Sequence, residues 1–160
     1  MDIQEPEFKF VRDVIRHVLS DYWPGIQWTP CGIFVHRNHD SPFSPAIQRK
    51  IDEILNMKGV MLHENYDEWV SREFISRWQH EEFCRQAIEA MVSPGPEEVK
   101  MHFLVVCASL SLIAALSVFY GLREAPDFSL KLILKHFEYL LNLGVITETF
   151  WIELEMFCAL

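Results

Sequence analysis

Basic residues are scarce in this chain, and the motifs that mark common enzyme classes are missing. The sequence has 14 Lys and Arg against 23 Asp and Glu, which gives a formal net charge of -9. Binding to nucleic-acid phosphates requires clustered Lys and Arg, so a general nucleic-acid-binding protein is disfavoured. The sequence also lacks a Gly-rich phosphate loop and a nucleophile-elbow motif. We therefore expect a protein that is not an enzyme and needs no cofactor, and the charge favours a partner that carries basic residues.

The four cysteines show no paired spacing, which disfavours a disulfide framework. Cys84, Cys107 and Cys158 fall on apolar helical faces, where a free thiol behaves as a small hydrophobic group. The first residues, MDIQEPEFKF, do not resemble a secretory signal peptide. These observations predict a reduced, cytoplasmic protein.

Two groups of Cys and His residues have spacings that could bind a metal ion. His80 and Cys84 stand one helical turn apart with Glu81 between them, which resembles a zinc-protease helix whose second histidine is replaced by cysteine. No third ligand is apparent in the sequence, which disfavours a zinc hydrolase. A second Cys/His tract, Cys31, His36 and His39, lacks a second pair of ligands. We expect neither to bind metal.

Apolar residues recur at steps of three and four along most of the chain, which predicts an all-α protein with about seven helices. A length of 160 residues favours one domain, 1–160. Prolines and glycines predict a Pro-rich loop at about 24–44 and a helix end at Gly59. The predicted helices cover residues 6–22, 44–59, 65–92 (one broken helix or two), 96–121, 126–143 and a short last segment from 147.

Residues 101–120 contain one histidine, three serines and no formal charge. Such a run is long enough to span a bilayer, and Lys100 and Arg123 flank it as snorkelling residues would. A helix that is apolar on all sides is otherwise the central helix of a soluble bundle. Because amphipathic segments lie on both sides of it, we favour a central helix at about 96–121 over a single membrane span.

Methionines and aromatic residues are frequent in the middle third of the sequence. This mixture is typical of adaptable binding surfaces, although each residue could also belong to the core. It would suit a groove for an amphipathic helix. The residues concerned are Met57, Met61, Tyr66, Trp69, Phe74 and Met91.

The order of these elements resembles the B-cell lymphoma-2 (Bcl) family of apoptosis regulators, and the short form is similar to divergent viral members. The resemblance covers nearly the whole chain and rests on layout. The family motif Asn-Trp-Gly-Arg at the start of the central helix corresponds to residues 97–100, EEVK, in which only the basic residue remains, as Lys100. The second family motif has a Trp and a Gly-Gly-Trp, whereas residues 149–152 read TFWI. We expect this protein to lack the C-terminal membrane anchor of many members.

The resemblance implies a fold and a function. The fold would be a Bcl-like bundle of about seven helices around the apolar one. The function would be inhibition of apoptosis by sequestering the Bcl-homology-3 helix of pro-apoptotic proteins in a hydrophobic groove, with the mitochondrial surface reached through partners. The groove would be formed by Ile51, Leu55, Tyr66, Trp69, Phe74, Ile88, Met91 and Phe103, with Lys100 facing the aspartate of the ligand.

Three alternatives remain open. Some viral proteins of this fold bind signalling adaptors through their outer faces, and the others are the zinc hydrolase and the single-span membrane protein. A homodimer formed through exposed apolar surface is a further expectation.

Overall fold

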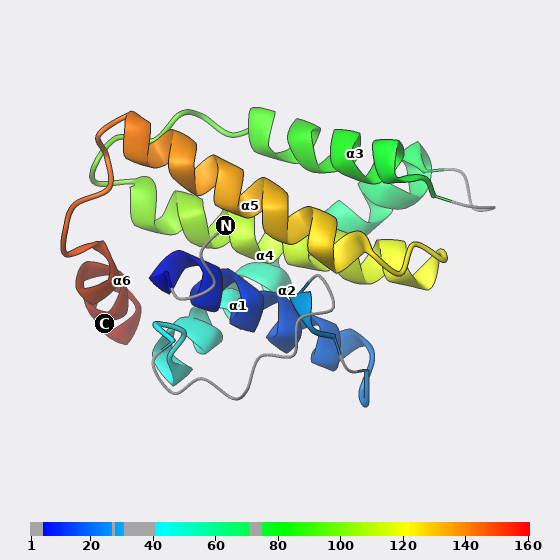
Figure 1. Ribbon diagram of the computed structural model, residues 1–160, viewed down its shortest axis with the longest axis horizontal. Coiled ribbons are helices and arrows are strands. Elements are labelled where there is room, and N and C mark those ends of the chain that lie inside the picture. The colour runs from blue at the N-terminus through cyan, green and yellow to red at the C-terminus, as the bar shows by residue number, and fades with distance from the viewer. Residues whose placement is uncertain (1–4, 27, 31–40, 71–74) are drawn as a thin grey trace.

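The computed structural model (Figure 1) describes residues 5–26, 28–30, 41–70 and 75–160, and within them the chain forms six α-helices and no strand. The prediction of an all-α protein is confirmed. The helices are α1 (Pro6–Tyr22), α2 (Pro45–Trp69), α3 (Arg77–Glu89), α4 (Val99–Phe119), α5 (Ala125–Asn142) and α6 (Phe150–Ala159).

Helix α4 lies at the centre of the bundle, with α1, α2, α3 and α5 packed against it (Figure 1). It is the only helix of the described residues that is long and apolar enough to cross a membrane, and 83% of its most apolar window is buried inside the protein. It begins three residues later than predicted, because residues 96–98 form a turn. The burial agrees with the interpretation of this segment as a core helix.

The number of helices differs from the prediction because α2 does not end at Gly59. The helix continues through this glycine to Trp69, and Gly59 is buried where α2 meets α4. A Cβ atom at Gly59 would lie 3.7 Å from Leu112 Cδ2, which is an ordinary van der Waals distance. The glycine therefore lies inside a continuous helix instead of ending it.

The caps of α2 and α3 follow familiar rules. Ser44 caps α2, because its hydroxyl accepts a hydrogen bond from the Ile47 amide at 3.3 Å, and Pro45 follows at the first helical position. Asn65 and Glu68 resemble a capping box in the sequence, but they lie inside α2 and do not begin a helix. A capping box is formed instead by Ser76 and Gln79 at the start of α3.

Helix α6 packs against the beginning of α2. The Ser44 hydroxyl donates a hydrogen bond to the Glu155 carboxylate, and the Lys50 ammonium group lies 5.7 Å from the centre of the Phe157 ring. Trp151 joins the aromatic cluster around Phe103 at the same end of the core. The second half of α2 lies away from α6 and contacts α4 and, through Tyr66 and Trp69, Phe83 of α3.

Candidate functional site

An apolar groove of about 430 Å³ lies between the second half of α2, the helix α3 and the middle of α4. We call it the α2–α3–α4 groove. It is lined by Lys58, Met61, Leu62, Asn65 and Trp69 from α2, by Phe83, Gln86, Ala87, Ala90 and Met91 from α3 and the residues after it, and by Val105 and Ser109 from α4.

Large apolar side chains reach the surface at this groove. Met61 is 61% exposed and Trp69 is 37% exposed. The Trp69 ring meets the buried Phe83 ring edge-on, with centroids 5.6 Å apart. Phe83 in turn contacts the buried Tyr66 ring at 5.3 Å, so the floor of the groove is continuous with the core. The core fixes the floor, while Met61 remains free to adapt.

The only charged residue in the described lining is Lys58, which is exposed. Asn65, Gln86 and Ser109 are the other polar residues there. A ligand would therefore meet a mostly apolar surface, one cation and a few hydrogen-bonding groups. Such a surface is suited to one face of an amphipathic helix.

Only some of the groove residues predicted from the sequence line the α2–α3–α4 groove. Trp69 and Met91 line the α2–α3–α4 groove. Leu55 and Ile88 are partly buried and pack against the core without lining the groove. Phe74 lies outside the described residues, as do Cys31, His36 and His39. The remaining apolar positions, Ile51, Tyr66 and Phe103, are fully buried core residues.

Lys100 lies away from the α2–α3–α4 groove. Its ammonium group is 3.6 Å from the Glu153 carboxylate of α6. Hydrogen bonds from the hydroxyls of Thr147 and Thr149, together with Lys100, lower the pKa of Glu153. Lys100 therefore already has a partner, which it would have to leave in order to meet an aspartate of a ligand.

His80 and Cys84, the pair of the zinc hypothesis, are both completely buried. Ser129 donates its hydroxyl proton to the Leu110 carbonyl at 2.9 Å, so it accepts from His80 Nε2 at 3.0 Å. His80 Nδ1 then accepts from the Ser117 hydroxyl at 2.7 Å. Both ring nitrogens are thus used inside the protein.

Burial lowers the pKa of His80 to about 4 and raises that of the Cys84 thiol to about 12. The imidazole is therefore neutral and the thiol protonated at neutral pH. Zinc binds the thiolate, so Cys84 is a poor ligand in this state. Among the described residues, His80 and Cys84 do not belong to any group of three potential metal ligands.

Several lining residues were not predicted as groove residues, although the sequence carried a signal for some of them. Met61 belongs to the Met and aromatic cluster noted above, and Phe83 and Val105 lie on apolar stripes. Nothing in the sequence marks Lys58 as a groove residue, because lysines are common on the exposed faces of helices.

Comparison of the chain with protein-family models, curated proteins and solved structures finds no match. The groove is accordingly interpreted from its own geometry. Its shape and lining suit one apolar face of a helix.

Proposed function

We propose that this protein binds an amphipathic helix in the α2–α3–α4 groove. The observation that carries the proposal is the exposed apolar surface of Met61 and Trp69 on α2, beside a groove of about 430 Å³ that α3 and α4 complete. Exposed apolar surface is expensive in water and marks binding sites when it is contiguous and concave. A helix with apolar anchors at steps of three and four would cover this surface.

The layout of the helices and their resemblance to the Bcl family support a more specific function. We propose that the bound helix is the Bcl-homology-3 segment of a pro-apoptotic protein, and that sequestering it inhibits apoptosis. No catalytic step is involved. The resemblance supplies the partner, whereas the lining residues supply the chemistry of binding.

The proposal can be tested by isothermal titration calorimetry with a panel of Bcl-homology-3 peptides. Met61→Glu places a charge against the apolar anchors of the ligand, and Met61 is exposed enough for the change to leave folding intact. We expect it to cost about 2 kcal/mol or more, which is at least a tenfold weaker complex. Failure of every peptide to bind the wild-type protein would contradict the proposal.

Met156→Glu provides a matched control. Met156 is 65% exposed, close to the 61% of Met61, and lies on α6 at the opposite end of α2 from the groove. The same substitution there should leave peptide affinity unchanged. Equal losses in the two variants would show that binding does not depend on the α2–α3–α4 groove.

Two lysines are candidates for the aspartate of the bound helix. The resemblance assigns this role to Lys100, whereas the lining of the groove offers Lys58. A double-mutant cycle between each lysine and the ligand aspartate distinguishes them. Because Lys58 is exposed, its coupling should be less than about 1 kcal/mol and should fade with added salt.

Adaptor binding through an outer face is the second candidate function. It is favoured by the exposed apolar residues Ile152 and Met156 on α6, which are 64% and 65% exposed. They surround a shallow hollow together with Trp151. If no Bcl-homology-3 peptide binds and Met156→Glu abolishes capture of an adaptor, this function replaces the first.

A further inference from the structure

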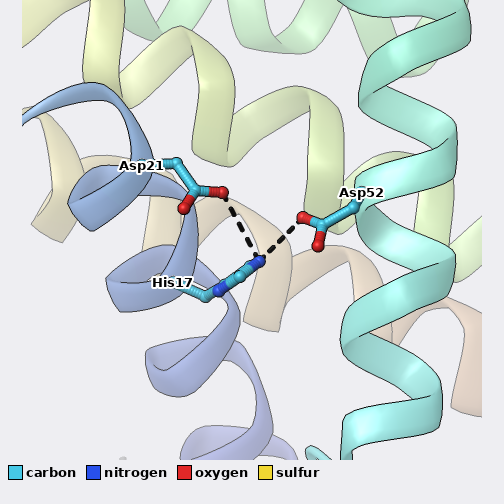
Figure 2. A group of neighbouring side chains, drawn as sticks. All are labelled: His17, Asp21 and Asp52. Carbon is cyan, nitrogen blue, oxygen red and sulfur yellow. Dashed lines mark hydrogen bonds and ion pairs between the residues drawn. The ribbon is translucent and has the colours of Figure 1, made fainter.

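Three potential metal ligands converge where α1 meets α2, away from the α2–α3–α4 groove. Figure 2 shows His17 of α1 pointing between the carboxylates of Asp21 and Asp52. His17 Nε2 lies 2.8 Å from Asp52 Oδ1 and 3.6 Å from Asp21 Oδ2. The three ligand atoms all lie within 4.8 Å of one another.

The charges in this cluster are not balanced. Two carboxylates share one imidazole, and His17 is the only ion-pair partner of either carboxylate among the described residues. Asp21 also lies in the last turn of α1, which contains no basic residue. The negative end of the helix dipole disfavours an acidic side chain there. A bound cation would offset both sources of repulsion.

The spacing of the ligand atoms fits a small transition-metal ion. Zinc lies about 2.0–2.1 Å from nitrogen and oxygen ligands, and tetrahedral angles then separate two ligands by about 3.3 Å. The separations of His17 Nε2 from the two carboxylate oxygens, 2.8 and 3.6 Å, lie on either side of that value. Small side-chain rotations would therefore admit the ion between the three groups.

The surroundings also suit a bound ion. The His17 side chain is only 14% exposed, and its ring packs 5.8 Å from the Phe43 ring, which limits its movement. The side chains of Asp21 and Asp52 are 54% and 41% exposed, so a water molecule can reach a fourth position. Because His17 and Asp21 belong to α1 and Asp52 to α2, an ion here would link the two helices.

We propose that His17, Asp21 and Asp52 form a zinc-binding site that fastens α1 to α2. The imidazole and the two carboxylates would supply three ligands and water the fourth. An imidazole ligand favours zinc over magnesium or calcium, which prefer oxygen ligands alone. Zinc would displace the proton from Nε2, the atom that now contacts both carboxylates.

The test is calorimetric titration of zinc into the chelator-treated full chain, with thermal unfolding measured in parallel. We expect one zinc ion per chain and a higher Tm in the presence of zinc. Asp21→Asn and Asp52→Asn each replace a carboxylate ligand with a neutral amide at a position open to solvent, so both variants should fold. Each should weaken zinc binding by roughly tenfold or more, since even residues behind the ligands often contribute that much.

His63→Gln is the matched control. His63 lies 3.4 Å from Asp67 on α2, a pair of the same residue types without a third ligand. Its replacement should change neither the zinc stoichiometry nor the affinity. Any loss comparable to that of Asp52→Asn would contradict the proposed site.

Two results would overturn the proposal. Absence of zinc binding in excess zinc would show that the cluster is only a hydrogen-bonded ion pair. Undiminished binding in both aspartate variants would place the zinc elsewhere in the chain. Neither result would affect the proposed groove function, because peptide binding is measured separately and at other residues.

Discussion

His80 should make the protein lose stability as the pH falls. Its pKa is lowered from 6.5 to about 4, chiefly because burial disfavours the charged form. Between these values the unfolded state binds more protons than the folded state. The stabilisation from neutral His80 is therefore complete above pH 6.5 and is lost progressively toward pH 4.

The size of the effect follows from the two pKa values. With an unfolded value of 6.5 and a folded value of about 4, the free energy of unfolding should fall by about 2 kcal/mol between pH 7 and pH 5 from this residue alone. His136 contributes in the same direction, because burial and the neighbouring His102 lower its pKa to about 4. The free energy of unfolding of the wild type should therefore fall between pH 7 and pH 5 by more than the contribution of His80 alone.

Urea unfolding at pH 7 and pH 5 measures this quantity when the wild type is compared with His80→Gln. Glutamine keeps a donor and an acceptor for Ser117 and Ser129 but does not titrate. The substitution can lower the free energy of unfolding equally at both pH values. The decrease from pH 7 to pH 5 should nevertheless be about 2 kcal/mol smaller in His80→Gln than in the wild type.

Asn56→Gln is the control for this comparison. It changes an exposed side chain that does not titrate, so the fall in stability between pH 7 and pH 5 should equal that of the wild type. An identical fall in His80→Gln and the wild type would refute the buried, neutral state of His80.

Three further changes test the packing around α4 by urea unfolding and circular dichroism. Gly59→Ala should raise the free energy of unfolding by about 0.5–1 kcal/mol, because α2 is continuous there and the new Cβ has ordinary room beside Leu112; a loss would contradict the continuous helix. Ala114→Arg should prevent folding, because Ala114 is fully buried and the charge would have no partner; a native spectrum and unchanged midpoint would place this face outside the core. Tyr66→Phe should cost about 1–2 kcal/mol, because it removes the 3.0 Å hydrogen bond to Ser117; no loss would show that this bond is not part of the buried network.

The central helix could be predicted from sequence because its signal is local. A long run without formal charge is unusual, and amphipathic neighbours require an apolar partner. Gly59 misled the prediction because glycine has two uses. It often ends helices, yet it also occurs inside helices that are held by packing, and Gly59 is buried inside the continuous helix α2.

The groove was harder to predict because helical periodicity does not say which helix a side chain faces. Tyr66 and Trp69 lie on one apolar stripe of α2, yet Tyr66 is buried and Trp69 lines the groove. His80 shows the same limit for polar residues. Its burial depends on Ser117 and Ser129, which are far away in sequence and come close only when α3 packs against α4 and α5.

The central claim is that an amphipathic helix binds in the α2–α3–α4 groove. Amide chemical-shift mapping of the labelled protein with a bound Bcl-homology-3 peptide tests it most directly. We predict that the largest shifts fall on residues 58–69, 83–91 and 105–109, which include the lining residues. Largest shifts on α6 around Ile152 and Met156, with the groove unchanged, would contradict the account.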